Sequence, residues 1–370
     1  MALAERIRVL MVYAKPAIAR AVAARPDLDV TILCPQRQRP EFEALGCGAA
    51  LCDEPYVPGA KLSLAAIRSV RRAIARAKPD VVHAFYPRAL AHTVLATVGL
   101  ADRPRIVSYR GVTAPAPRWS PVQRISYQSP RVDWHACESA AVRDALVASG
   151  VPAERCGVVF NCLNGPLASC DRRTARDAWG VPEDAFVVAM TANMRAVKGA
   201  DVLLRAAAAC RDLARVHFVL MGRVHDLRLP KLSAAARLEG RLQLTGYLPD
   251  APTLSGAADL FVMPSRAEAL SVALLEAMGQ GVCPVVSDAG GMKEAVRHGQ
   301  DGWVFPSGDW GALAAAIRTL SSDDALRQRL AASAKRRVAE AFSPEAVAMR
   351  MADLYRGAVN HPATRARRAA

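Results

Sequence analysis

Two glutamates, Glu268 and Glu276, stand eight positions apart in the segment VMPSRAEALSVALLEAMGQGVCPVVSDAGG, between an apolar run and two glycines. The pattern predicts that the chain leaves a strand at LFVMPS, turns, and enters the helix VALLEAMGQG. The turn would present Glu268 and the unpaired amides of roughly residues 270–273 at the carboxyl end of a strand. Such amides bind phosphate oxygens, and a carboxylate further into the helix can accept hydrogen bonds from ribose hydroxyls. The combination favours a nucleotide site, although isolated glutamates are more often solvated surface charges.

The elements that must position these carboxylates follow an alternating pattern. Short apolar or β-branched runs alternate with alanine-rich helical stretches, which predicts parallel sheets with right-handed crossovers. A chain of 370 residues exceeds what one core usually organises. We therefore expect an α/β protein with two Rossmann-like domains facing across a cleft, over residues 1–165 and 166–342. A helix at about 343–359 is expected to pack back on the first domain, and residues 360–370 form a basic tail.

Missing motifs and the composition of the chain disfavour several classes of protein. No G-x-G-x-x-G follows the first strand and no G-x-x-x-x-G-K-[ST] occurs, which disfavours a dinucleotide oxidoreductase and a P-loop enzyme. The nine cysteines form no C-x-x-C pair, so we expect reduced thiols. Neither a signal peptide nor an apolar run of about 20 residues is evident, which predicts a cytoplasmic or peripheral protein. The net charge of +15 fits a nucleic-acid binder, a protein on an anionic membrane, or an enzyme for anionic substrates.

The segment around the two glutamates resembles the retaining glycosyltransferases of family 4, which have the GT-B fold. Their signature has two glutamates separated by seven residues in a P-S-x-x-E, E-A-M-x-x-G-x-P-V-V and G-G-x-x-E context. The resemblance continues in AVKGADVLLRAAA and HGQDGWVFPSGD, and more loosely in DVVHAFYP and FNCLN. The matching residues, in order, are Pro264, Ser265, Glu268, Glu276, Ala277, Met278, Gly281, Pro284, Val285, Val286, Gly290, Gly291 and Glu294.

The resemblance implies transfer of a sugar from a nucleotide-sugar donor, most commonly a UDP-sugar, with no metal and no other cofactor. It implies that Glu268 contacts hydroxyls of the transferred sugar, that Glu276 contacts the donor ribose, and that Lys198 neutralises the diphosphate. The family usually has an arginine where this chain has Asn193, and Arg195 is close enough to replace it. The expected catalytic set is Glu268, Lys198, Arg195 and His83, and the expected donor-binding set is Glu276, Asn193, Gly222, Leu270, Ser271 and Val272.

The acceptor is expected to bind the N-terminal half, through Tyr86, Arg110 and Arg118. Many family members have a histidine where this chain has Arg110, and an arginine cannot act as a base at neutral pH. Arg110 is therefore assigned to an anionic group of donor or acceptor. For His83, a buried structural histidine is nearly as plausible as a catalytic one. The acceptor would be a saccharide or a lipid-linked sugar, used in lipopolysaccharide, exopolysaccharide or glycolipid assembly at the cytoplasmic membrane face.

Arginines in the first half could account for attachment to an anionic membrane. Arg68, Arg72 and Arg76 recur at four-residue spacing on one face of a helix predicted over 62–80, and 113–131 should be a long loop carrying arginines and aromatics. An ordinary solvated face is an equally simple interpretation. A nucleotide-sugar epimerase and a nucleic-acid-binding protein remain alternative functions, although no nucleic-acid recognition motif is apparent. The D-x-D sequence at Asp27–Asp29 lies away from the expected site and is taken as incidental.

Overall fold

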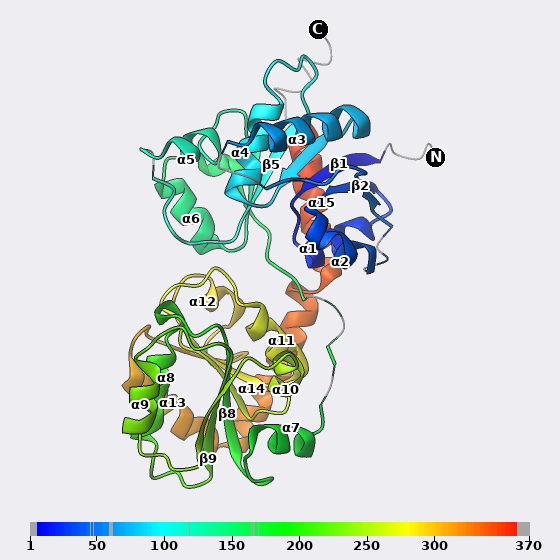
Figure 1. Ribbon diagram of the computed structural model, residues 1–370. Coiled ribbons are helices and arrows are strands. Elements are labelled where there is room, and N and C mark those ends of the chain that lie inside the picture. The colour runs from blue at the N-terminus through cyan, green and yellow to red at the C-terminus, as the bar shows by residue number, and fades with distance from the viewer. Residues whose placement is uncertain are drawn as a thin grey trace. The chain divides into compact units, whose positions relative to one another are not determined.

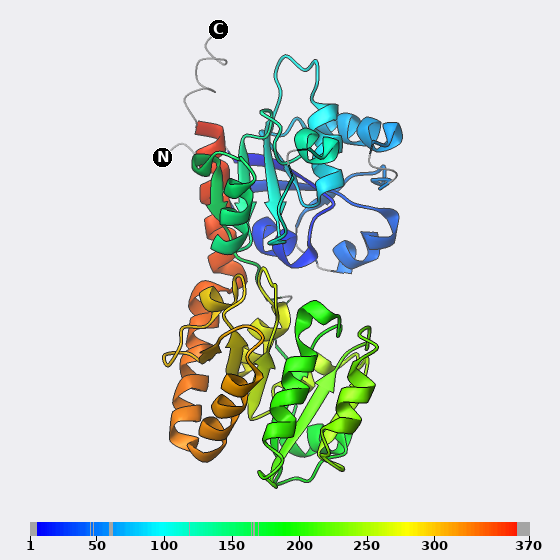
Figure 2. The ribbon, with the colours of Figure 1, turned by 90° about the vertical axis from the view of Figure 1, so that its left-hand side faces the viewer.

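The computed structural model describes residues 6–44, 46, 48–58, 62–117, 119–163, 165, 167–168 and 170–360. The chain forms two compact units, Met1–Gly165 with Ser343–Ala370, and Pro166–Phe342. Each unit contains one parallel sheet with helices on both of its faces (Figures 1 and 2). The α/β architecture with two Rossmann-like domains, predicted from alternating apolar and helical segments, is confirmed.

The sheet of the first unit has the order β3-β2-β1-β4-β5-β6-β7, and all its pairings are parallel. Its central strands are almost continuously buried because helices cover both faces. The strand order reverses between β1 and β4, and such a reversal is where open α/β sheets bind ligands. The strands are β1 Ile7–Val12, β2 Leu28–Leu33, β3 Ala50–Leu51, β4 Val81–Ala84, β5 Arg105–Arg110, β6 Trp134–Cys137 and β7 Cys156–Val158.

The last helix in the described part of the chain belongs to this first unit. α15 (Pro344–Asn360, red in Figure 1) lies against α1 (Pro16–Ala23), and its apolar face joins the core of the sheet. The hydroxyl of Tyr355 is 2.7 Å from Nδ1 of His83 on β4, inside that core. The other helices of the unit are α2 Arg39–Ala44, α3 Leu64–Ala77, α4 Pro87–Ala96, α5 Pro121–Ile125 and α6 Ala140–Ala148. The segment predicted as a long loop over 113–131 thus contains the short helix α5.

The sheet of the second unit has the order β10-β9-β8-β11-β12-β13, again entirely parallel. Its order reverses between β8 and β11, so the loops that follow these two strands lie at the switch point. The strands are β8 Phe186–Thr191, β9 Val216–Met221, β10 Leu242–Gly246, β11 Leu260–Met263, β12 Cys283–Ser287 and β13 Trp303–Phe305. The helices are α7 Arg172–Trp179, α8 Ala200–Ala209, α9 Leu229–Ala235, α10 Ala251–Ser255, α11 Val272–Gln280, α12 Met292–Ala295, α13 Trp310–Ser322 and α14 Asp324–Ala341.

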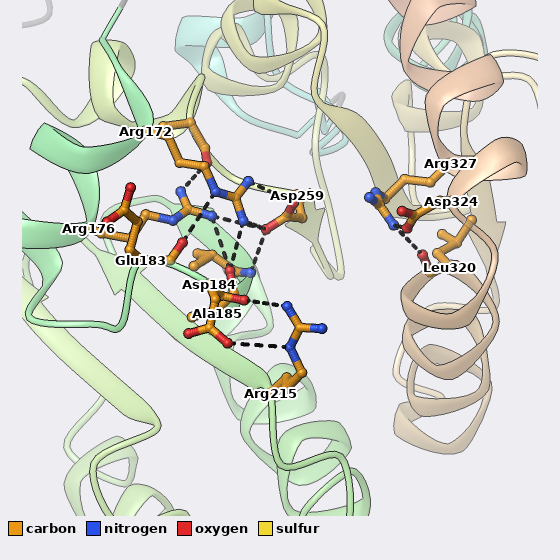
Figure 3. Close-up of polar contacts among 12 residues, drawn as sticks. Arg172, Arg176, Glu183, Asp184, Ala185, Arg215, Asp259, Leu320, Asp324 and Arg327 are labelled. Carbon is orange, nitrogen blue, oxygen red and sulfur yellow. Dashed lines mark hydrogen bonds and ion pairs between the residues drawn. The ribbon is translucent and has the colours of Figure 1, made fainter.

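A partly buried group of ion pairs attaches α7, the first helix of the second unit, to the end of the sheet at which β11 begins. Arg172 and Arg176 both reach Asp259, which directly precedes β11 (Figure 3). Arg176 is only 1% exposed and also donates to the carbonyls of Ala185 and Ala257. Asp259 in turn accepts from the amide of Val187 at 2.8 Å. Because these bonds pair both terminal nitrogens of a buried guanidinium, α7 is fixed to the sheet from its first turn.

The remaining general expectations concern thiols, membrane spans and metal sites. All eight cysteines in the described ranges are free, and six of them are buried. None of the helices that the structure describes is long and apolar enough to cross a bilayer. Within the same ranges, no three His, Cys, Asp or Glu side chains are grouped as metal ligands would be.

Candidate functional site

At the switch point of the second unit, Lys198 forms an ion pair with Glu268. Lys198 ends a 3₁₀ turn after β8 (Ala196–Lys198), and Glu268 lies in the turn after β11. The lysine Nζ donates to Oε2 of the glutamate, and the Ser265 hydroxyl lies 3.5 Å from the same oxygen. Both side chains keep some exposure, 26% for Lys198 and 13% for Glu268. The structure therefore brings together the two residues to which the resemblance gave the central roles.

Two glycines allow the backbones around this pair to approach closely. Gly199 has φ +70°, and a Cβ there would lie 1.8 Å from the carbonyl oxygen of Pro264. Gly290 has φ +56°, and a Cβ there would lie 2.0 Å from the carbonyl oxygen of Glu268. The amide of Gly291 donates to that same Glu268 oxygen at 3.0 Å. Glycine is needed at these positions because any side chain would push the loops of Lys198 and Glu268 apart.

An arginine–aspartate clamp, which the sequence reasoning missed, joins the same two loops. Both terminal nitrogens of Arg266 lie 2.7 Å from the carboxylate of Asp201, and one of them also donates to the carbonyl of Ala196. The Arg266 amide bonds the carbonyl of Val197 at 2.8 Å. Burial favours a higher pKa for Asp201, but the bonds from Arg266 outweigh it and hold that pKa below its ordinary value. In the sequence, the clamp is indicated only by one charged residue beside each motif: Arg266 follows P-S, and Asp201 follows K-G-A.

The start of α11 supplies the expected backbone donors. Ser271 is the N-cap, and its hydroxyl accepts from the amide of Leu274 at 3.3 Å. Leu270 and Ser271 are at most 6% exposed, so a ligand could meet them mainly through their backbone. Val272 opens the helix, and Glu276 lies partly exposed one turn further on. The turn and helix therefore form where the spacing of the glutamates predicted them.

The loop that carries Asn193 and Arg195 rests on the loop after β9. The backbone of Met194 bonds the carbonyl of Arg223 and the amides of His225 and Asp226, at 2.8 to 3.1 Å. Gly222, with φ +132°, lies so close to β8 that a Cβ would be 1.9 Å from the carbonyl oxygen of Ala192. Gly222 thus acts by close backbone packing, while the side chains of Asn193 and Arg195 are exposed at the same edge of the sheet.

His83, expected in the catalytic set, lies inside the first unit. Its side chain is fully buried, bonds the Tyr355 hydroxyl and stacks on Phe85 at a centroid distance of 4.3 Å. Burial lowers the pKa of His83 to about 3, which keeps the imidazole neutral. These contacts match the structural role that the sequence left open, and a fully buried ring cannot touch a substrate.

The residues expected to bind the acceptor have different surroundings. Arg110 is 2% exposed, lies 4.6 Å from the ring centroid of Tyr127, and donates to the carbonyl of Ala114. It therefore holds the segment after β5 in place. The sequence predicted that Arg110 contacts a ligand, but its side chain is buried and occupied by these internal contacts. Tyr86 is 38% exposed at the end of β4, in a position to meet a ligand. Arg118 lies outside the described residues.

Two arginines of the stripe predicted on α3 have carboxylate neighbours. Arg72 lies 2.9 Å from Glu54, and Arg76 lies 3.7 Å from Asp53. These carboxylates offset much of the charge that was expected to face a membrane. Asp27, the first residue of the D-x-D sequence, is likewise ion-paired with arginines at 25 and 356.

Two family models match the chain. The model "Glycosyl transferases group 1" matches residues 171–337, and the model "Glycosyltransferase Family 4" matches residues 17–164. Together they cover nearly all of the second unit and most of the first.

Curated relatives match at moderate identity. A D-inositol 3-phosphate glycosyltransferase of Geodermatophilus obscurus is 33% identical over 212 residues, which is 54% of this chain and 46% of the relative. The lipopolysaccharide core biosynthesis glycosyltransferase LpsD of Rhizobium meliloti is 31% identical over 191 residues, 51% of this chain and 53% of the relative. The sulfoquinovosyl transferase SQD2 of Arabidopsis thaliana is 29% identical over 302 residues, 76% of this chain and 57% of the relative. The chain thus spans about half the length of the curated relatives it matches.

Solved structures agree over almost the whole chain. HepE of Anabaena, in complex with UDP and glucose, matches with a TM-score of 0.75 and 21% identity over 94% of this chain and 99% of that one. The lipopolysaccharide outer core galactosyltransferase WaaB matches with a TM-score of 0.68 and 14% identity over 94% and 99%. At these identities the likeness establishes the fold.

Proposed function

Because this chain belongs to the glycosyltransferases of family 4, we propose that it transfers a sugar from a UDP-sugar to a saccharide or lipid-linked acceptor, with retention of the anomeric configuration. The observation that carries the proposal is the pairing of Lys198 with Glu268 at the switch point, next to the start of α11. A cation, a carboxylate and unpaired helix-start amides are the groups that a sugar diphosphate requires.

The chemistry follows from where charge develops. Departure of the nucleotide leaves oxocarbenium character on the sugar and increasing negative charge on the diphosphate. In our proposal Lys198 exchanges its bond to Glu268 for a bond to the diphosphate, assisted by Arg195 and by the amide of Val272. Glu268, released by the lysine, accepts hydrogen bonds from hydroxyls of the transferred sugar. The acceptor hydroxyl attacks from the face that the nucleotide leaves, and the departing phosphate takes its proton, so the protein needs no nucleophile.

We propose that turnover requires no metal ion, since a lysine, an arginine and backbone amides supply the positive charge at the phosphate. Activity should persist in excess EDTA. Complete loss of activity that Mg²⁺ or Mn²⁺ restores would contradict this proposal.

The biological setting that we propose is lipopolysaccharide, exopolysaccharide or glycolipid assembly by a protein peripheral to the cytoplasmic membrane face. Two relatives support the setting by name, one for lipopolysaccharide core biosynthesis and one for sulfoquinovosyl transfer. The UDP and glucose bound by HepE support a UDP-sugar as donor. The net charge of +15 favours an anionic partner, and an anionic membrane serves that role better than nucleic acid in an enzyme of sugar transfer.

A panel of nucleotide sugars tests the function directly. Nucleotide release is measured for each donor, with and without a mixture of candidate acceptors, and sugar products are analysed in parallel. Release that increases with acceptor supports transfer. Conversion of the donor to an epimeric sugar without net transfer identifies an epimerase, and tight nucleic-acid binding without turnover of any donor contradicts an enzymatic role.

A further inference from the structure

A cavity of about 800 Å³ opens at the switch point of the first unit. Its lining comes from the segments that follow β1, β2, β3 and β4, together with α5, so it lies at the carboxyl edge of that sheet. Parallel sheets bind ligands at this edge. The donor chemistry described above, confined to the second unit, leaves this cavity unused.

Three tyrosines form an aromatic wall in the cavity. The ring of Tyr13 lies 4.6 Å from that of Tyr86 and 5.7 Å from that of Tyr56, measured between centroids. The hydroxyl of the buried Tyr56 is 2.7 Å from Nδ1 of His92, which holds its ring in place. Tyr86 keeps 38% of its surface exposed, so this part of the wall is open to a ligand. Aromatic faces of this kind stack on the apolar face of a sugar or polyol ring.

Tyr13 has a strained backbone at the point where β1 ends. Its φ is +57°, and a bulky residue other than glycine rarely adopts such a value. Strain of this kind persists only where surrounding contacts impose it, and it concentrates at functional sites. Here the strained residue places its ring against Tyr86 and its hydroxyl 2.9 Å from a nitrogen of Arg37.

The charged residues in the described lining of the cavity are all basic. Arg37 and Arg88 line it, and no carboxylate occurs among the described lining residues. In this respect the cavity differs from the α3 surface, where Arg72 and Arg76 have carboxylate partners. Two exposed guanidinium groups in a lining whose described residues include no carboxylate suit a phosphate, which they can bind through paired hydrogen bonds.

We propose that this cavity is the acceptor site, and that the acceptor carries a phosphate group on or beside a sugar or polyol ring. The ring stacks on Tyr13 and Tyr86, and Arg37 and Arg88 bind the phosphate. This inference rests on the proposed function, because it names the substrate class of the same transfer reaction. The phosphate can belong to a free sugar phosphate or to a lipid head group. Val57 lines the cavity with 52% exposure, and Trp119, which precedes the lining residue Ser120, is 84% exposed, so apolar side chains accompany the charge.

Binding measurements on the full chain separate these sources. Mannose 6-phosphate and mannose are titrated calorimetrically in the presence of saturating UDP, which blocks the donor site. Vesicles of phosphatidylcholine, with and without phosphatidylinositol, are tested by sedimentation. Preference for mannose 6-phosphate over mannose identifies a free sugar phosphate, and binding only to phosphatidylinositol vesicles identifies a lipid head group.

Variants decide whether the cavity is responsible. The double variant Arg37→Gln/Arg88→Gln should weaken binding of the preferred probe about tenfold or more, because it removes charge-assisted bonds to phosphate. Tyr86→Leu should weaken it by about fivefold, through the lost stacking contact. The matched control Arg173→Gln/Arg205→Gln removes two exposed arginines of the second unit and should bind as the wild type does.

The result that overturns the inference is equally specific. If neither probe binds the wild type, or if the cavity and control variants bind the probe alike, the cavity is not a phosphate-bearing acceptor site. UDP affinity is measured for every variant. A wild-type protein that binds UDP but neither probe contradicts only this inference, whereas a protein that turns over no nucleotide sugar contradicts the proposed function.

Discussion

The ammonium group of Lys198 and the carboxylate of Glu268 form an ion pair between the loops that follow β8 and β11. The two groups have different proposed partners, a diphosphate and the hydroxyls of a sugar. A donor must therefore replace one internal ion pair with two sets of external bonds. This exchange makes the two residues separable by experiment.

Glu268→Gln should strengthen binding of UDP while it slows sugar transfer. The variant removes the carboxylate that competes for Lys198, and UDP lacks the sugar that Glu268 is proposed to contact. For a partly exposed pair we expect a gain of about fivefold in UDP affinity, or about 1 kcal/mol. Calorimetric titration with UDP measures it, and a UDP affinity lower than that of the wild type would contradict the exchange.

Lys198→Ala should impair the chemical step, whereas Glu276→Ala should impair donor binding. Loss of Lys198 removes positive charge where negative charge develops, so kcat should fall by about 10²–10³-fold. Loss of Glu276 should mainly raise the KM for the donor, because a ribose contact is present before and during the reaction. Steady-state kinetics on both variants distinguish these effects, and equal changes in kcat and KM for the two would refute the assigned roles.

Gly290→Ala should inactivate the enzyme although it adds one methyl group. The new Cβ would lie 2.0 Å from the carbonyl oxygen of Glu268, so the turn that carries this carboxylate must move. A displacement of about 1 Å at a reacting group can cost about 10²-fold in rate. Gly299→Ala is the matched control, because it has φ +71° but no atom within 4 Å of the added Cβ. Similar rates for the two alanine variants would show that the close approach is unimportant.

Asp259→Ala should destabilise the second unit by about 3–5 kcal/mol, because it leaves the buried guanidinium of Arg176 without its carboxylate. Asp184→Ala is the control, since Asp184 forms an ion pair with Arg215 (Figure 3) and both side chains are 75% exposed. Breaking that pair should cost less than about 1 kcal/mol. Urea unfolding followed by circular dichroism compares the two variants, and equal losses of stability would contradict the distinction.

Acid should destabilise the first unit through His83 and His135. Burial lowers the pKa of each to about 3 from an ordinary value of 6.5. Between these values the unfolded chain binds protons that the folded chain excludes, so stability is full above pH 6.5 and falls as the pH decreases toward 3. Each histidine contributes up to about 1.4 kcal/mol per pH unit to this loss.

His83→Gln keeps a polar partner for Tyr355 but removes the titration, so it should flatten the dependence of the unfolding temperature on pH. The exposed His225→Gln serves as the control. Thermal unfolding between about pH 7.5 and about pH 5 provides the test, and unchanged slopes for His83→Gln would contradict the prediction.

Local pattern determined much of this protein. Alternating apolar strands and alanine-rich helices specify two parallel sheets because buried strands and amphipathic helices leave periodic traces in the chain. The turn with Glu268 and the helix with Glu276 lie in one continuous segment, so the local pattern of an apolar run, a turn and a helical stretch placed them at the end of β11 and in α11. Motifs of this length need no knowledge of distant residues.

Tertiary structure decided which distant groups meet. Lys198 and Glu268 are separated by 70 positions, and Arg266 and Asp201 by 65, yet each pair forms because β8 and β11 are neighbours at the switch point. Burial decided the rest, since it converts His83 and Arg110 from candidate ligands into internal braces. A sequence shows the type of a side chain, but its exposure and its partners depend on the packing of segments that are far apart along the chain.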